Sequence, residues 1–180
     1  MTQLTRPTRR LFFALWPSSA ERTALAAWQA ALQQLCGGRP QAPLMLHATL
    51  VFLGAVAEER MQALQLAAQE ISCSGFMLQL DVARYWGHNH LVYAAPGVVP
   101  SPLMQLVKEL EQKLLHHHFA FERRSYKPHV TLLRHARWTD TPLPAMSPVI
   151  LAVRDFVLVQ SVSEGRGVRY EILARFPLAE

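Results

Sequence analysis

A four-residue pattern, histidine-aliphatic-threonine-leucine, occurs twice in this chain of 180 residues and constrains its fold more than any other feature. The first copy runs from His47 to Leu50 and the second from His129 to Leu132. Both copies lie in apolar segments typical of β-strands, in which side chains alternate between the two faces of a sheet. Each histidine therefore shares a face with the threonine two residues later. A polar pair repeated inside a sheet is costly to bury without a function.

If the two strands lie side by side, the four polar side chains line one cleft. His47 and His129 are then two proton-transfer groups, and Thr49 and Thr131 are two hydrogen-bond donors beside them. Two imidazoles with an ordinary pKa of about 6.5 can serve as acid and base near neutral pH, and the hydroxyls can hold anionic oxygens. One copy alone would be weak evidence, since a lone strand histidine is more often structural. The repeated pattern favours acid–base chemistry and suits a phosphodiester substrate.

The composition excludes several classes of protein. Hydrophobic residues make up 51% and charged residues 17% of the chain, as in a folded globular protein. The net charge of +5 fits RNA or another anionic substrate, although the Lys and Arg residues are scattered. Cys36 and Cys73 lie in unrelated contexts, which predicts neither a disulfide nor a C-x-x-C site and favours a reducing cytoplasm. No apolar stretch approaches the roughly 20 residues of a membrane span.

The hydrophobic pattern predicts strand, helix, strand and hairpin around each motif, which indicates an α+β fold with two similar halves. Ser18 and Glu21 form a capping box, which predicts the start of one long helix, and Gly37 with Gly38 predicts its end. Ser101 is expected to cap the helix of the second half. The other expected helix is 57–72, and the expected strands besides the second motif are 10–16, about 44–53 ended by Gly54, 76–85, 90–95, 149–159 and 168–176.

The residues around the motifs have a family likeness. The segments Arg10-Leu-Phe-Phe-Ala, Phe52-Leu-Gly and Tyr126-x-Pro-His-Val-Thr-Leu-Leu-Arg134 resemble those of two-histidine phosphoesterases, and in particular the bacterial RNA 2′,3′-cyclic phosphodiesterases, formerly called 2′-5′ RNA ligases. The likeness covers nearly the whole chain. It implies a bilobed, pseudo-twofold α+β fold of two antiparallel sheets flanked by helices around a central cleft. Residues 1–180 would form one domain, with lobes around 10–95 and 101–177 that can exchange strands.

The resemblance also implies roles for the site residues. His47 would donate a proton to the leaving oxygen, His129 would accept one from the attacking water, and Thr49 and Thr131 would hold the phosphate. Arg134 matches a phosphate-contacting arginine, but in a regular strand it would face away from His129, so a bulge or strand end is needed. The implied product is a 2′-phosphomonoester, and the reverse reaction with a 5′-hydroxyl would give a 2′-5′ linkage. We expect a cytoplasmic monomer, because the amphipathic helices are all used in covering the sheets, and it would act on RNA with a 2′,3′-cyclic phosphate end without cofactor, metal or membrane.

Three alternatives remain open at this point. A metal-dependent phosphodiesterase could use His88 and His90, although no cluster of ligand spacing lies near either motif; a chelator distinguishes this case. The same fold could act on a small cyclic nucleotide or on an ADP-ribose cyclic phosphate. A module that only binds RNA would use the basic surface. The aromatic residues that could stack on a base are Phe52, Tyr85, Trp86 and Tyr126.

Overall fold

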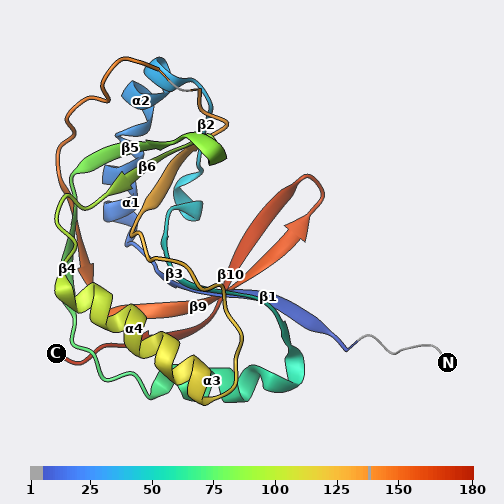
Figure 1. Ribbon diagram of the computed structural model, residues 1–180. Helices are drawn as coiled ribbons and strands as arrows, with labels where there is room; N and C mark the ends of the chain where they lie inside the picture. The colour runs from blue at the N-terminus through green and yellow to red at the C-terminus, as the bar shows by residue number, and fades with distance from the viewer. Residues whose placement is uncertain (1–5, 138) are drawn as a thin grey trace.

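Antiparallel sheets dominate the computed structural model, which describes residues 6–137 and 139–180 (Figure 1). Within these residues, one four-stranded sheet has the order β10-β9-β1-β3, a second has the order β2-β7-β6-β5, and β4 pairs with β8 in a two-stranded sheet. The strands are β1 Thr8–Leu15, β2 Arg39–Pro40, β3 Ala48–Ala57, β4 Phe76–Leu80, β5 Val82–Trp86, β6 Leu91–Ala95, β7 Val130–Arg134, β8 Val149–Val153, β9 Asp155–Glu164 and β10 Gly167–Pro177. The predicted α+β class is confirmed.

Both large sheets combine strands from the two halves of the sequence. The hairpin of β9 and β10 joins β1 and β3 of the first half, whereas β7 of the second half pairs with β2 and β6 of the first half. The two motif strands, β3 and β7, therefore lie in different sheets. The separate sheet of β4 and β8 is an addition to the two sheets expected from the sequence.

Helices cover the sheets on their outer sides (Figure 1). α2 (Gln29–Cys36) lies against the sheet that contains β7, α1 (Ser19–Ala26) packs on β8, and α3 (Met61–Gln69) and α4 (Ser101–His116) lie below the sheet that contains β3. The capping box is confirmed, because the Ser18 hydroxyl accepts from the Glu21 N–H and the Glu21 carboxylate accepts from the Ser18 N–H. Pro100, not Ser101, occupies the N-cap position of α4.

The helix expected between Ser18 and Gly37 is in fact two helices. The interruption at Ala27 and Trp28 is slight, because both residues keep right-handed helical backbone angles and the Trp28 N–H donates to Leu25 instead of to the residue four positions earlier. The Trp28 side chain is 2% exposed, and its indole N–H donates to the Ser147 carbonyl at 3.1 Å. Gly37 and Gly38 have the positive φ angles expected at the end of the second helix.

Several expected strands also differ in their bounds. β3 begins at Ala48, after a 3-10 turn at Pro43–Met45, and it continues through Gly54 to Ala57. Gly54 adopts a φ of 71°, so the glycine permits a kink inside the strand instead of ending it. The range expected as one strand over 76–85 is divided between two sheets at Asp81.

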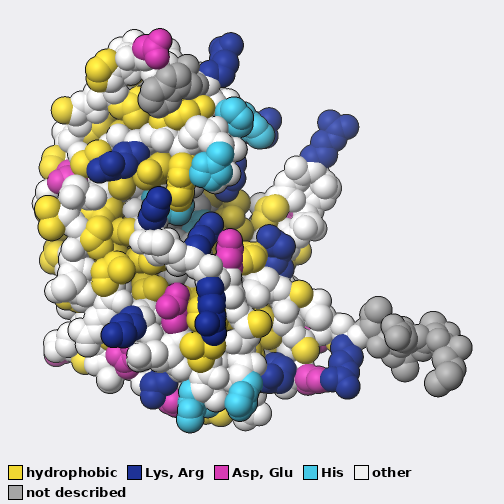
Figure 2. Space-filling model, viewed as in Figure 1, with side chains coloured by type: hydrophobic (Ala, Val, Ile, Leu, Met, Phe, Trp, Pro, Cys, Tyr) yellow, Lys and Arg dark blue, Asp and Glu magenta, His cyan; other side chains and the backbone are white. Residues whose placement is uncertain are grey.

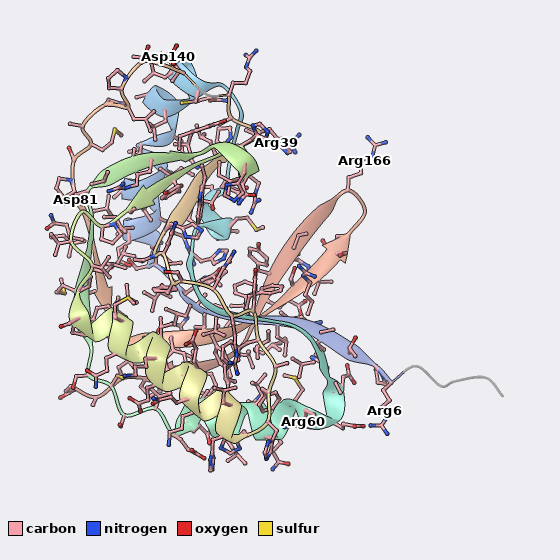
Figure 3. All side chains as sticks on the ribbon, viewed as in Figure 1. Arg6, Arg39, Arg60, Asp81, Asp140 and Arg166 are labelled. Carbon is pink, nitrogen blue, oxygen red and sulfur yellow. The ribbon has the colours of Figure 1, made fainter. Side chains whose placement is uncertain are left out.

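The division at Asp81 and a second one at Arg154 both lie where the chain leaves one sheet for another. The Asp81 carboxylate accepts from the Gly97 N–H at 2.7 Å, which fixes the chain where β4 ends and β5 begins. The range 149–159 is divided in the same way at Arg154, between β8 and β9. β9 and β10 continue beyond the sheet as a hairpin with Arg166 at its tip (Figure 3).

One large apolar cluster runs through the described residues and joins both sheets to their helices. Phe13, Phe156 and Phe176 pack edge to face and stacked beneath the β10-β9-β1-β3 sheet. Cys36 and Cys73 are buried free thiols. The basic residues on the face seen in Figure 2 are spread over it, with no continuous basic block. Among the described helices, none is both long enough and apolar enough to cross a membrane.

Candidate active site

The two motif strands bring their polar residues to one pocket. His47 and Thr49 from the β3 motif and His129 and Thr131 from the β7 motif line a cavity of about 200 Å³ between the two large sheets. These four side chains therefore lie in one cleft, as the alternating pattern predicts. The remaining lining residues are Gln41, Met45, Trp86, Asn89, Leu91, Arg124, Arg134 and Tyr170.

Both histidines are held by the same backbone contact. Nδ1 of His47 lies 2.7 Å from the carbonyl oxygen of Met45, and Nδ1 of His129 lies 2.7 Å from that of Lys127. A carbonyl oxygen can only accept a hydrogen bond, so Nδ1 must carry the hydrogen in each ring. Nε2 is thereby left as the nitrogen that can exchange a proton in the pocket. Nε2 of His47 lies 3.2 Å from the Thr49 hydroxyl oxygen.

Aromatic rings surround His47. The Trp16 indole stacks on the imidazole with centroids 5.4 Å apart and an angle of 19° between planes. The rings of Phe12 and Tyr170 each lie 5.1 Å from it. These three residues come from β1, the segment directly after it, and β10. Sequence analysis did not identify them as site residues, because they are far from the motif in the chain.

His129 has a similar but more open setting. Trp86 of β5 and Tyr93 of β6 meet the imidazole edge to face, with centroid distances of 5.2 and 5.4 Å. Arg124 also lines the pocket, and it forms an exposed ion pair with Glu122 at 3.5 Å. In the sequence, only its position in the polar and basic run from Glu122 to Lys127, just before the second motif, indicates that Arg124 lies near the site.

Burial changes the acid–base properties of both imidazoles. Burial among these rings, together with the smaller effect of the positive charges of His129, Arg134 and Arg22, lowers the pKa of His47 to about 4, although the hydrogen bond to the Met45 carbonyl acts in the opposite direction. Burial also lowers the pKa of His129, with a smaller contribution from Arg124. Both rings are therefore neutral at pH 7 in the free protein. The ordinary pKa predicted from the sequence is wrong for His47, because the sequence does not reveal which rings bury it.

Arg134 reaches the pocket through a β-bulge. In the pairing of β6 with β7, Val92 lies opposite Leu133 and Tyr93 lies opposite Thr131, so Leu132 has no partner. The extra residue reverses the alternation of the strand. Arg134 consequently lies on the same side as Thr131 and lines the pocket. The irregularity that this arginine requires is therefore present in β7.

The first motif strand contains the same irregularity. Phe13 lies opposite Val51 and Ala14 opposite Thr49, which leaves Leu50 without a partner. The bulge turns Phe52 to the side of Thr49, and both residues line an adjoining cavity of about 220 Å³. The two motif strands are thus equivalent in register, with Phe52 in one at the position of Arg134 in the other.

The four aromatic candidates for base stacking separate into two groups. Phe52 lines a cavity together with His47, and Trp86 lines the pocket that contains both His47 and His129. Tyr126 packs against the core, where its phenol oxygen is buried and burial raises its pKa. Tyr85 lines other cavities and its hydroxyl donates to the Ala136 carbonyl at 3.3 Å.

The histidines outside the motifs form no such site. His88 and His90 belong to the turn between β5 and β6, and neither lines the pocket of His47 and His129. Across residues 6–137 and 139–180, no three His, Cys, Asp or Glu side chains are grouped so that they could hold a metal ion.

Comparison with known proteins gives consistent results over nearly the whole chain. Residues 16–159 match the model of the 2′-5′ RNA ligase superfamily. The RNA 2′,3′-cyclic phosphodiesterase of Escherichia coli (strain K12) is 35% identical over 173 residues, 96% of this chain and 98% of that protein. The protein of the same name from Thermus thermophilus is 29% identical, over 94% of this chain and 90% of its own length.

Solved structures agree with these sequence matches. The crystal structure of E. coli LigT complexed with 3′-AMP superposes with a TM-score of 0.86 at 33% sequence identity, over 97% of this chain and 100% of that chain. The apo form of E. coli LigT gives a TM-score of 0.87, over 98% and 100%.

Proposed function

Because this chain belongs to the 2′-5′ RNA ligase superfamily, we propose that it hydrolyses RNA ends carrying a 2′,3′-cyclic phosphate to 2′-phosphomonoesters. The observation that carries this proposal is the pair of backbone-anchored histidines that both present Nε2 to one pocket. Three relatives, which match 76–96% of this chain, are named RNA 2′,3′-cyclic phosphodiesterases, and this supports the choice of substrate.

The proposed reaction is an in-line attack of water on the cyclic phosphate. Nε2 of His129 accepts a proton from the water as its oxygen bonds to phosphorus. The bond from phosphorus to the ribose 3′ oxygen breaks, and Nε2 of His47 donates a proton to that oxygen. Overall, one water molecule is consumed and the cyclic diester opens to a 2′-phosphate and a free 3′-hydroxyl. The choice of His47 as the donor follows the family likeness.

The other polar residues of the pocket would stabilise the transition state. The hydroxyls of Thr49 and Thr131 would donate hydrogen bonds to the non-bridging phosphate oxygens, and Arg134 would add a charge-assisted contact. These groups are fixed by strands of two sheets, so they need little rearrangement as charge develops. A metal is not required by this mechanism.

Three further points belong to the proposal. Ligation is the reverse reaction, with a ribose 5′-hydroxyl in place of water, and we assign it as a side activity. The protein would act as a cytoplasmic monomer, supported by the free buried thiols of Cys36 and Cys73 and by helices that cover both large sheets. A small cyclic nucleotide or an ADP-ribose cyclic phosphate is the alternative substrate in the same pocket.

The proposal is tested by incubating an oligoribonucleotide that ends in a 2′,3′-cyclic phosphate with the protein in excess EDTA. Chromatography separates the opened ends from the cyclic ends. We expect the same initial rate of ring opening with and without the chelator. A rate abolished by EDTA and restored by a divalent metal would favour the metal-dependent alternative. Binding of the oligonucleotide without turnover under either condition would favour the module that only binds RNA.

The pH dependence follows from the two lowered pKa values. One imidazole must be protonated and the other neutral, and in the free protein both pKa values lie below 6.5. The value of kcat/KM should therefore peak below pH 6.5 and fall about tenfold per pH unit at higher pH. A bound phosphate anion favours the charged imidazoles, so kcat should peak at a higher pH than kcat/KM. Initial rates between pH 4 and 9 measure both, and a kcat/KM optimum above pH 7 would contradict this account.

Phe52 provides a test of how the substrate base is held. Its ring lines the cavity beside His47 and Thr49, and the Arg10 guanidinium lies 4.8 Å above the ring. We propose that the terminal base stacks on Phe52. The Phe52→Ala variant should lose about tenfold in kcat/KM, since base stacking on an aromatic residue contributes about 1–3 kcal/mol. Phe52→Tyr should retain activity, and an unchanged Phe52→Ala variant would remove this residue from the site.

A further inference from the structure

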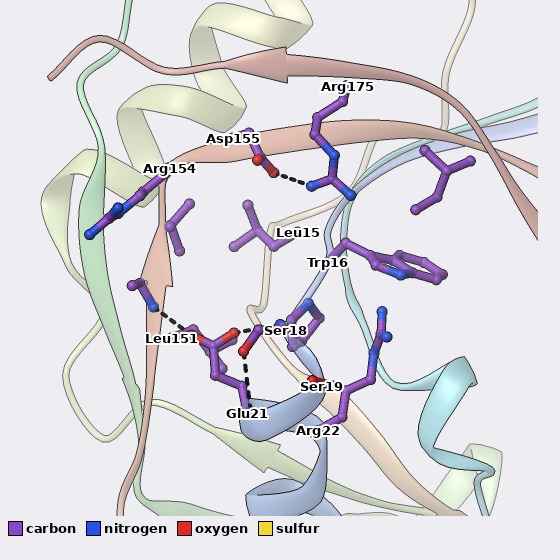
Figure 4. A pocket seen from close by; sticks show the side chains of 14 residues that line it. Leu15, Trp16, Ser18, Ser19, Glu21, Arg22, Leu151, Arg154, Asp155 and Arg175 are labelled. Carbon is purple, nitrogen blue, oxygen red and sulfur yellow. Dashed lines mark hydrogen bonds and ion pairs between the residues drawn. The ribbon is translucent and has the colours of Figure 1, made fainter.

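A second and larger pocket lies next to the histidine cleft. It has a volume of about 590 Å³ and is bounded by the end of β1, the start of α1, and the strands β8, β9 and β10 (Figure 4). Trp16 belongs to its wall and also stacks on His47 at 5.4 Å. One indole therefore connects this pocket to the proposed active site.

Arg22 lines this pocket with two guanidinium nitrogens that have no hydrogen-bond partner among the described residues. Its guanidinium lies over the Trp16 ring at 5.1 Å, and Figure 4 shows it pointing from α1 toward the side of the pocket where Arg175 lies. Stacking engages the face of a guanidinium but none of its in-plane N–H donors. Nε and Nη2 are buried with no hydrogen-bond acceptor among the described residues. Burial and the charge of Arg175 lower the pKa of Arg22 by more than the neighbouring Glu21 raises it, so its positive charge is only partly compensated.

The carboxylates of the pocket are already engaged. Glu21 accepts from the N–H groups of Ser18 at 2.7 Å and Ala152 at 2.8 Å. Asp155 forms an ion pair with Arg175 at 2.7 Å, which leaves other N–H donors of Arg175 available. Arg154 also lines the pocket, but Figure 4 shows its side chain pointing away from Arg22 and Arg175. Because both carboxylates are engaged, Arg22 and Arg175 keep N–H donors for another acceptor, so this part of the pocket favours an anion.

We propose that this pocket binds a phosphate group between Arg22 and Arg175. A guanidinium presents parallel N–H donors that match the oxygens of a phosphate, and an anion there would compensate the charge of Arg22. If the proposed function holds, the group is a backbone phosphate of the RNA that leads to the cyclic end, because the pocket begins one indole away from His47. A free phosphate ion has the same chemistry, and the experiment separates the two sources.

The test compares two substrates, an oligoribonucleotide with a 2′,3′-cyclic end and a 2′,3′-cyclic mononucleotide, in Arg22→Gln and Arg175→Gln. The mononucleotide has no second phosphate. For each variant, the ratio of kcat/KM for the oligonucleotide to that for the mononucleotide should fall about tenfold, the effect of one charge-assisted hydrogen bond. The slope of log KM against log salt for the oligonucleotide should weaken by about 0.7, as for one lost phosphate contact. Lys108→Gln, which removes an exposed charge on α4, should leave both quantities unchanged.

Two variants are needed because Arg22 touches Trp16 beside His47, whereas Arg175 is held by Asp155. Loss of inorganic phosphate binding in both variants, seen by NMR titration, with an unchanged substrate ratio would support the pocket and assign it to free phosphate. Equal losses on both substrates, or no change in either the ratio or phosphate binding, would overturn the proposal. If the wild type hydrolyses neither substrate, the proposed function fails, and oligonucleotide affinity by fluorescence anisotropy in the same variants decides on the pocket.

Discussion

Replacement of either motif histidine by glutamine is expected to lower kcat/KM for a cyclic-phosphate RNA end by about 10²–10⁴-fold. Glutamine is close in size to histidine, and its amide nitrogen can occupy the position of Nε2, the nitrogen that faces the pocket. It cannot take up or release a proton at neutral pH. His47→Gln and His129→Gln therefore remove proton transfer while the pocket keeps its shape.

The two histidines should behave as a unit. Because acid and base act in the same step, the double variant should be no slower than the slower single variant. His116→Gln is the matched control, since His116 is exposed at the end of α4 and does not line the pocket. Initial rates at saturating and limiting substrate give the losses, and circular dichroism verifies folding. Losses that multiply in the double variant would contradict coupled acid–base catalysis.

Replacement of Arg134 by alanine is expected to lower kcat by about 10²–10³-fold, the loss typical of one preorganised donor to developing negative charge. Arg134→Lys should recover only part of the rate, because an ammonium does not offer the paired donors of a guanidinium. The measurement is single-turnover kinetics, which separates the chemical step from binding. A loss confined to KM would assign Arg134 to ground-state binding alone.

The stability of the same variant provides an independent comparison. Arg39 lies opposite Arg134 in the β2–β7 ladder, and like charges directly opposite each other destabilise a sheet. Arg134→Ala should therefore unfold at the same temperature as the wild type or slightly higher, although it loses activity. Arg39→Ala removes the other arginine of the pair. Arg39 is exposed near the end of the β2-β7-β6-β5 sheet and does not line the pocket (Figure 3). This variant should relieve the same repulsion and keep its activity.

The shared face of histidine and threonine could be predicted from the sequence because strand alternation is a local property. The bulges could not be predicted in this way, because the adjacent apolar residues Leu132-Leu133 and Leu50-Val51 also fit a regular strand covered on both faces. The strand pairing in the structure is what shows the extra residue in each strand, and with it the cleft side of Arg134 and Phe52.

The surroundings of the histidines could not be predicted in this way. Trp16 and Tyr170 lie near opposite ends of the chain, and they meet at His47 because β9 and β10 join the sheet of β1 and β3. Each of these pairings depends on long-range packing. The lowered pKa of His47 depends on the same contacts, so it was inaccessible from the motif alone.

The element boundaries show the same division between local and tertiary signals. The capping box at Ser18 and Glu21 is a local interaction and was predicted correctly. The strand division at Asp81 was missed because the apolar alternation continues through this position while the chain moves from one sheet to another. At the second division, the adjacent polar residues Arg154 and Asp155 interrupt the alternation, a local signal that the prediction of one strand over 149–159 did not use. The hydrophobic pattern identifies the buried residues without specifying the sheet to which they belong.

The most direct test of the central claim is phosphorus NMR of the terminal phosphate after complete conversion of a 2′,3′-cyclic oligoribonucleotide in EDTA. The account requires a 2′-phosphomonoester as the product, formed by the wild type and absent with His47→Gln or His129→Gln. A cyclic phosphate that persists with the wild type would contradict the assigned activity. A 3′-phosphomonoester would contradict the assignment of His47 as proton donor to the 3′ oxygen.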